Sequence, residues 1–231
     1  MNEYQKIKKI PIVIISTFGH CGIDWLHSLI DSHKEILIIP SLSFFRKVHA
    51  LKKNKGIEMN NSFKTKLIRK NIMSMLIKKN SSGLSQRHLI LKSDQKKIFE
   101  KYLANFLTKD DEKNLEKKFF WGIHYAYSKI KKINLNKMKV IVTQEHVPWN
   151  CEKYETYFNS KYVFMMRDPR ASIAGCIKAH KEKKLMSYYF DHHLSFIISA
   201  KKFNKKMLKK NKILILKNEE MHNNLNKEMK K

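Results

Sequence analysis

Residues 11–40 read PIVIISTFGHCGIDWLHSLIDSHKEILIIP, and this stretch decides the fold. Its first part, residues 11–16, is a short apolar run rich in β-branched side chains, which is typical of a buried parallel strand. Residues 17–22 then supply a turn with two glycines, and apolar side chains recur at helical spacing over residues 23–32. A second apolar run follows at 36–39. The stretch therefore predicts a strand, a turn, a helix and another strand.

Three further apolar runs of the same character lie at residues 138–143, 161–166 and 212–216. Each is followed by a helical pattern, and strands that alternate with helices favour βαβ units. The sequence therefore predicts an α/β fold, with a parallel sheet flanked by helices. Right-handed crossovers place the carboxyl ends of such strands at one edge of the sheet, where ligands bind.

The middle of the chain, about 44–135, has a different pattern. Apolar side chains recur there every three or four residues among many lysines, with helical stretches near 85–107 and 119–132 and a loop at 78–86. We interpret this part as a helical insert. A chain of 231 residues buries one sizeable core, so a single domain covering 1–231 is expected.

The formal net charge of +28 is the most unusual number in the composition. It is compatible with lysines spread over solvated faces, and with a nucleic acid, an anionic membrane surface or a highly anionic small cofactor as partner. Charge alone does not choose among these partners.

The hydrophobic content and the cysteines indicate the class of chain and its compartment. A hydrophobic fraction of 42% is typical of a globular protein, and no apolar run approaches the roughly 20 residues that span a bilayer. The apolar run near the start is short and lacks a small-residue cleavage site, so we expect a strand and no signal peptide. Cys21, Cys151 and Cys176 are odd in number and scattered, which argues against a disulfide framework and suits a reducing, cytoplasmic setting.

The first motif with chemical meaning is the turn after the first strand. Such a turn directs backbone N–H groups and the positive end of a helix at an anion, which makes it a candidate phosphate seat. It is not a Walker motif, because no GK[ST] ending follows. The candidate binding residues are Gly19, His20, Cys21, Gly22, Ile23, Asp24 and Trp25.

The second motif is KYVFMMRDPRASIAG at residues 161–175, where a strand ends at Arg167 and Asp168-Pro169 open the next helix. An arginine in this place can direct two hydrogen bonds at a phosphate. The alternative is a surface arginine or one paired with an aspartate.

The third motif is TQEHVPW at residues 143–149, directly after a strand. His146 is a candidate general base, because an unperturbed imidazole titrates near pH 6.5. The alternative is a histidine that only contributes to a polar surface.

Taken together, these motifs resemble those of the sulfotransferases that use 3′-phosphoadenosine 5′-phosphosulfate (PAPS). HCGIDW followed by LIDSHKEILIIP is similar to the first cofactor-binding segment of that family, and RDPR at 167–170 to the second. TQEHVPW is similar to its K-T-H-L-P segment, and ILILKNEEM at 213–221 to a strand–helix element near its end. The resemblance implies a P-loop-containing nucleoside triphosphate hydrolase-like fold and transfer of a sulfuryl group to a hydroxyl or amine, without a metal.

The resemblance also implies roles for particular residues. Residues 19–25 would hold the 5′-phosphosulfate and Arg167 the 3′-phosphate. The family's second phosphate-binding serine falls at Gly175, with Ser172 nearby as a substitute. His146 would be the base, with Glu145 as a second candidate. The acceptor would be a carbohydrate, a lipid or a small molecule, and the lysines of the insert make an anionic one plausible.

Three positions depart from the family pattern. His20 stands where a lysine or arginine is usual, and Ile23 and Asp24 replace hydroxyl residues. A carboxylate within about 4 Å of a phosphate costs about 1 kcal/mol even at the dielectric constant of water. Family members commonly continue beyond the point that corresponds to Lys231, which implies a small variant or a truncated chain.

Two alternatives to an active sulfotransferase follow. One is a related fold that binds a nucleotide or an anionic glycan without turnover, and the other is a basic nucleic-acid-binding protein. A metal site at Asp191, His192 and His193 is not expected, because neighbouring residues on a helix point about 100° apart.

Overall fold

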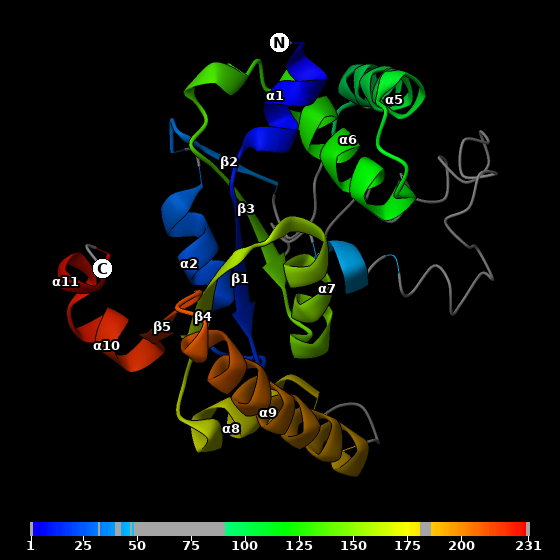
Figure 1. Ribbon diagram of the computed structural model, residues 1–231. Helices are drawn as coiled ribbons and strands as arrows, with labels where there is room; N and C mark the ends of the chain where they lie inside the picture. The colour runs from blue at the N-terminus through cyan, green and yellow to red at the C-terminus, as the bar shows by residue number, and fades with distance from the viewer. Residues whose placement is uncertain are drawn as a thin grey trace. The chain divides into compact units, whose positions relative to one another are not determined.

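The computed structural model describes residues 2–31, 33–39, 43–46, 48, 91–180 and 186–229 (Figure 1). The loop expected at 78–86 and much of the expected insert lie outside the described residues. The prediction of a single domain is not tested by the structure and stays a prediction.

Five strands form one all-parallel sheet flanked by helices, as the alternation of strands and helices predicted. The strands are β1 (Ile12–Thr17), β2 (Ile36–Ile38), β3 (Val140–Glu145), β4 (Lys161–Met166) and β5 (Ile213–Lys217). Their order is β2-β3-β1-β4-β5, so the first strand is central. The later strands divide to its two sides, and the carboxyl end of β1 is therefore a topological switch point, the usual place of a ligand in such sheets.

The chain divides into two compact units. Unit 1 comprises Met1–Pro11 and Ile30–Thr143, and unit 2 comprises Ile12–Leu29 and Gln144–Lys231.

Unit 1 contains the helices α1 (Glu3–Lys9), α5 (Ser93–Lys109) and α6 (Leu115–Ile130), a short 3₁₀ turn η2 (Leu135–Lys137), β2 and most of β3. The predicted helices at 85–107 and 119–132 correspond to α5 and α6, although α5 begins only at Ser93. From Lys118 to Ser128 every residue of α6 is buried, which is the pattern of a helix enclosed in a core. Aromatic rings pack between the three helices, with Tyr4 5.2 Å from Phe106 and 5.0 Å from Tyr125.

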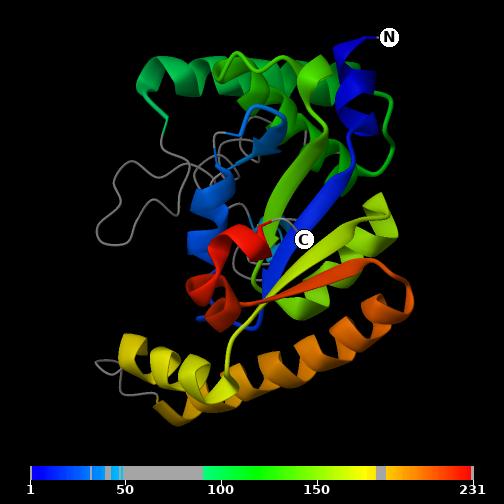
Figure 2. The ribbon, with the colours of Figure 1, turned by 90° about the vertical axis from the view of Figure 1, so that its left-hand side faces the viewer.

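Unit 2 contains β1, β4 and β5 with the helices between and after them. These are α2 (Ile23–Ile30, whose last residue falls in unit 1), α7 (Pro148–Phe158), α8 (Pro169–His180), α9 (Met186–Lys209), α10 (Asn218–Asn223) and α11 (Leu225–Glu228). Proline begins both α7 and α8, in keeping with its preference for the first helical turn. Helices α8 and α9 pack side by side, as Figure 2 shows.

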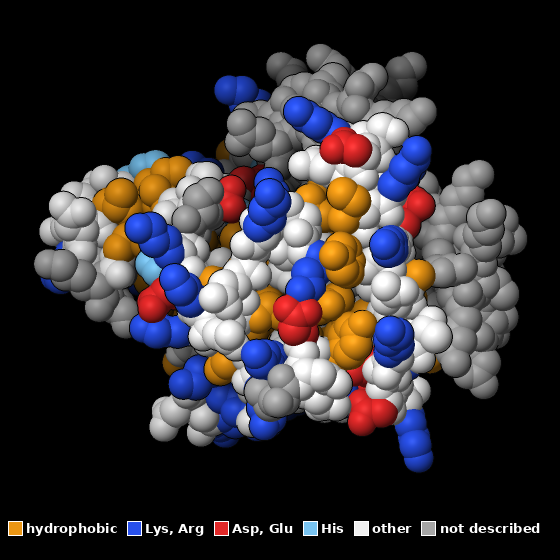
Figure 3. Space-filling model, turned by 90° about the horizontal axis from the view of Figure 1, so that it is seen from above, with side chains coloured by type: hydrophobic (Ala, Val, Ile, Leu, Met, Phe, Trp, Pro, Cys, Tyr) orange, Lys and Arg blue, Asp and Glu red, His pale blue; other side chains and the backbone are white. Residues whose placement is uncertain are grey.

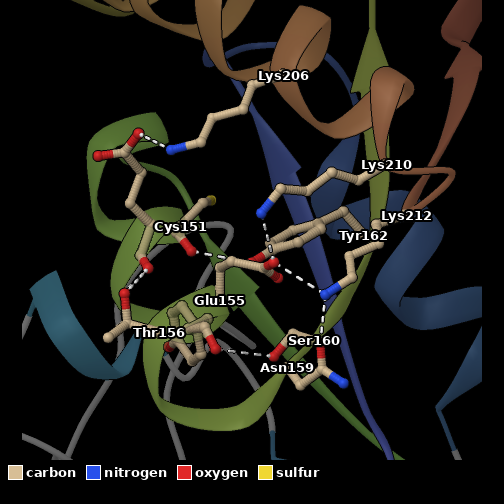
Figure 4. Close-up of polar contacts among 11 residues, drawn as sticks. Cys151, Glu155, Thr156, Asn159, Ser160, Tyr162, Lys206, Lys210 and Lys212 are labelled. Carbon is tan, nitrogen blue, oxygen red and sulfur yellow. Dashed lines mark hydrogen bonds and ion pairs between the residues drawn. The ribbon is translucent and has the colours of Figure 1, made fainter.

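Salt bridges join α7 to the turn between α9 and β5 in unit 2. Glu155 accepts hydrogen bonds from Lys210 and Lys212, and Lys212 also contacts Asn159 (Figure 4). Asn159 ends α7 in the left-handed conformation, with φ of 49°, which asparagine tolerates better than most residues.

The cationic side chains are dispersed on the face that Figure 3 shows, among acidic, polar and hydrophobic ones, and form no single continuous patch there. Several lysines are ion-paired, such as Lys139 with Glu35 at 2.7 Å. None of the helices within the described ranges is long and apolar enough to cross a membrane.

Candidate functional site

The turn between β1 and α2 has an unusual backbone. Gly19, His20 and Gly22 have φ of +102°, +50° and +83°, in the left-handed region. The first hydrogen bond of α2 runs from the amide of Leu26 to the carbonyl of Gly22 at 3.1 Å. The amides of residues 23–25 precede that bond, so the helix does not satisfy them, and they lie at its positive end.

Three consecutive carbonyls of this turn accept hydrogen bonds from side chains of three other elements. Ser172 Oγ in α8 donates to the carbonyl of Gly19 at 2.7 Å. Arg167 Nη1, directly after β4, donates to that of His20 at 3.2 Å, and Asn218 Nδ2, at the start of α10, to that of Cys21 at 3.2 Å. In each planar peptide the following N–H points opposite to the carbonyl. The amides of residues 20–22 are therefore directed away from the side chains that hold the carbonyls.

The two glycines of the turn allow side chains of unit 2 to approach closely. A Cβ on Gly19 would lie 3.0 Å from Cε1 of His193, and a Cβ on Gly22 would lie 2.3 Å from Nδ2 of Asn218. Both positions thus need glycine for two reasons, the positive φ and the lack of space.

Several of the polar groups in or against the turn are buried, whereas Arg167 is half-buried. Cys21 and Ser172 are fully buried, and His193 is 5% exposed. Cys21 Sγ donates to the carbonyl of Gly19 at 2.9 Å. Burial raises the pKa of the Cys21 thiol, which keeps it protonated.

Arg167 and Arg170 have different partners, although both belong to the second motif. The carboxylate of Asp168 binds Arg170 through both oxygens, and the hydrogen bond from Arg170 lowers the pKa of Asp168 to about 2. Within the described part of the chain, Arg167 forms no ion pair. The aspartate-paired arginine is therefore Arg170, and Arg167 contacts the turn.

The third motif ends β3 and leads into α7. Glu145 is fully buried, and its Oε1 accepts a hydrogen bond from the amide of Val147 at 3.1 Å. Its backbone carbonyl accepts one from Ser16 Oγ at 3.0 Å, which connects the motif to β1. His146, the next residue, is half-buried. Of the two candidate bases, His146 is thus the one with access to solvent.

The structure brings together most of the predicted cofactor residues. The segment from Gly19 to Gly22 contacts Arg167 and Ser172, and a Cβ on Gly175 would lie 3.5 Å from Cβ of His20. Asp24 is half-buried in the first turn of α2, where a carboxylate interacts favourably with the helix dipole.

Trp25 in α2 stacks on a histidine that the sequence had not drawn attention to. Its ring lies parallel to that of His222 in α10, with centroids 4.5 Å and planes 3° apart. Asn218 and Glu219 lie in the segment ILILKNEEM, which was expected to form a strand and a helix, but neither was expected to be a site residue. Glu219 accepts a hydrogen bond from the amide of Asp168 at 2.9 Å. These two residues directly follow β5, so the rule that ligands and polar residues gather at the carboxyl edge could have found them.

His193 was considered only as half of an unlikely metal-binding pair. It is buried while its neighbour His192 is exposed. The ring of His193 lies near that of Phe18, whereas the ring of His192 lies near that of Phe196. Nothing in the local sequence indicates its contact with Ser172, 21 positions earlier.

No protein-family model matches this chain, and no curated protein matches it. The fold and the site themselves define a parallel α/β protein with a turn suited to an anion at its topological switch point.

Proposed function

We propose that this chain is a sulfotransferase that binds PAPS at the β1–α2 turn and at Arg167. The observation that carries the proposal is the hydrogen bond from Arg167 to the carbonyl of His20, which links positions 147 residues apart. The two segments that resemble the cofactor-binding segments of the family thereby meet at the carboxyl ends of β1 and β4, which are paired in parallel. The proposal includes the P-loop-containing nucleoside triphosphate hydrolase-like fold, whose anion-binding turn likewise follows its first strand.

The residues at the turn fit an anionic nucleotide. The amides of residues 20–25 and the positive end of α2 suit the 5′-phosphosulfate. Arg167 has five N–H donors and uses one on His20, so donors remain for the 3′-phosphate.

When bound, PAPS supplies the sulfuryl group that passes to an acceptor hydroxyl or amine. The amides of the turn stabilise the negative charge that builds up on the oxygens during transfer, and they need no reorganisation because the carbonyls are held. His146 takes the proton of the acceptor. His20, when protonated, supplies the positive charge that a lysine or arginine supplies elsewhere in the family.

Asp24 favours a second function, nucleotide binding without turnover. Its carboxylate stands in the first helical turn, where it competes with an anionic ligand for the positive end of α2. The third possibility, binding of nucleic acid, is supported by the net charge of +28 but by no recognised motif.

Calorimetry with 3′-phosphoadenosine 5′-phosphate (PAP) tests the cofactor site. Arg167→Ala should weaken PAP binding about 10- to 100-fold, because a hydrogen bond to a charged group contributes about 1.5–3 kcal/mol. Arg170→Ala is the matched control, because the Arg170 side chain is 92% exposed and binds Asp168. The affinity of this variant for PAP should stay within about threefold of that of the wild type. No PAP binding by the wild type, or an equal loss in both variants, would contradict the proposal.

A turnover assay separates the possible functions. Labelled PAPS is incubated with a panel of saccharide, lipid and small-molecule acceptors, using the wild type and His146→Ala. PAP binding without turnover by the wild type supports the second function. Affinity for mixed oligonucleotides that falls steeply with salt supports the third.

A further inference from the structure

A buried hydrogen-bonded chain supports the β1–α2 turn. His193 Nε2 lies 2.8 Å from Ser172 Oγ, and Ser172 Oγ lies 2.7 Å from the carbonyl oxygen of Gly19. These two hydrogen bonds join α9, α8 and the turn, and both lie within unit 2. Because Ser172 is fully buried and His193 nearly so, water does not readily replace either partner.

The hydrogen-bond inventory assigns the protons of this chain. A carbonyl oxygen only accepts, so the single hydroxyl proton of Ser172 goes to Gly19. Ser172 Oγ must then accept from His193, which therefore carries a proton on Nε2. In the neutral imidazole Nδ1 is left without a proton. This atom faces Gly19, at 3.4 Å from the place a Cβ on that residue would take.

The surroundings keep His193 neutral while no anion is bound. Burial is the main cause that lowers its pKa, and the neighbouring His20 and His192 lower it further. The turn also carries Cys21, whose thiol stays protonated, and it is contacted by the cationic Arg167. On α9 itself, the acidic Asp191 is exposed. An anion at the turn would add negative charge near the imidazole, which favours its protonated form.

We propose that His193 is a positioning residue of the turn, and that binding of a phosphate or phosphosulfate group there is coupled to uptake of one proton by His193. The inference rests on the proposed function, since it assumes an anionic ligand at the turn. The proton comes from solvent and enters at Nδ1. The hydrogen bond from Nε2 to Ser172 is therefore kept. The turn keeps its conformation while the charge of the His193 imidazole changes.

Two substitutions separate positioning from protonation. His193→Gln keeps an N–H donor for Ser172 but cannot take up a proton, whereas His193→Leu loses both properties. His192→Gln is the matched control, because it changes the neighbouring, exposed histidine.

The test is PAP calorimetry at pH 7 in two buffers with different ionisation enthalpies, repeated from pH 6 to pH 8. The wild type and His192→Gln should take up a proton on binding and bind roughly tenfold more tightly at pH 6 than at pH 8, the limit for one coupled proton over this range being about 100-fold. His193→Gln should bind like the wild type at pH 8, within about threefold, and lose most of the uptake and of the pH dependence. His193→Leu should bind about tenfold more weakly at every pH, as expected when a buried hydrogen-bond partner is lost.

The outcomes distinguish this inference from the proposed function. Equal proton uptake in His193→Gln and the wild type would overturn the coupling while leaving PAP binding intact. Equal affinity of His193→Leu and the wild type would overturn the positioning role. If the wild type binds no PAP, the proposed function fails and the coupling fails with it. Nitrogen-15 NMR of the free protein then still tests the proton assignment, which a neutral His193 protonated on Nδ1 would contradict.

Discussion

The α5–α6 pair of unit 1 and the β1–α2 turn of unit 2 both depend on a glycine at a close approach, but in different ways. A Cβ on Gly122 in α6 would lie 2.9 Å from Cδ1 of Leu103 and 3.3 Å from Cδ1 of Phe106. A Cβ on Gly22 would lie 2.3 Å from an amide nitrogen of Asn218 that is hydrogen-bonded to the turn. The neighbour of Gly122 is a flexible apolar side chain. The neighbour of Gly22 is held in place by its hydrogen bond, and Gly22 itself has a positive φ.

The backbone is therefore held more tightly at the turn of unit 2 than in the helix pair of unit 1. In unit 1, apolar and aromatic side chains fill space around regular helices, and such packing tolerates small shifts. In unit 2, buried polar side chains hold a left-handed turn at the end of a strand. Strained backbone supported by dedicated hydrogen bonds is typical of functional sites.

Gly22→Ala should have the largest effect on stability. The new methyl group clashes with Asn218 and the backbone must keep a positive φ, so we expect a loss of about 3 kcal/mol in the free energy of unfolding, measured with urea. PAP binding should be lost with it. Gly175→Ala is the control, because its Cβ would make ordinary contacts at 3.5 Å or more within a helix, and it should be neutral or stabilising by up to about 1 kcal/mol. Equal stability of the two variants would show that the turn at Gly22 is no more constrained than helix α8 at Gly175.

The strands of this fold could be predicted from the sequence because their apolar runs are short, β-branched and separated by helical patterns. The predicted strand at 161–166 agrees with β4 at both ends, while β3 begins and ends two residues later than predicted. The error at β3 arises because Gln144 and Glu145 are polar but buried, so they read as loop residues.

The candidate site could be predicted only where a motif is local. The turn could be predicted because two glycines follow an apolar strand, and Arg167 could be predicted because it directly follows another apolar strand. Asn218 was not found, since it contacts Cys21 across 197 positions, and His20 gave no sign that it would adopt a positive φ. Such contacts depend on the packing of α8, α9 and α10, which no local pattern specifies.

In unit 1, the buried His124 should make the stability of the protein depend on pH. It is fully buried in α6, its Nδ1 lies 2.8 Å from the carbonyl of Phe120, and burial lowers its pKa to about 4. The unfolded chain, with a pKa near 6.5, binds more protons in this window, so stability should fall as the pH drops from about 6.5 to about 4. The loss should approach about 3 kcal/mol for this group. The free energy of unfolding, measured with urea between pH 4 and pH 8, should change less with pH in His124→Phe than in the wild type. An identical pH dependence in the two proteins would mean that His124 does not titrate as its burial implies.

Substitution of Glu155 in unit 2 should have the smallest effect on stability. It measures how much a polar contact away from the turn contributes. The Glu155 carboxylate is 16% exposed and accepts hydrogen bonds from Lys210 at 3.0 Å and Lys212 at 2.9 Å (Figure 4). Burial raises the pKa of Glu155, but the two lysines outweigh it and the net pKa is lowered. The stabilisation is therefore present above the unfolded value near pH 4.3 and is lost as the pH falls through the lowered pKa.

Glu155→Gln should cost about 1 kcal/mol at pH 7 and close to nothing at pH 2, as measured by urea unfolding. Glu152→Gln is the matched control on the same helix, because Glu152 and its partner Lys206 are both more than half exposed, and it should cost only a few tenths of a kcal/mol. A larger loss in Glu152→Gln would show that exposure does not rank these ion pairs. If Glu155→Gln instead lowered the free energy of unfolding as much as Gly22→Ala, polar contacts would constrain unit 2 throughout. The constraint at the turn would then not distinguish it as a functional site.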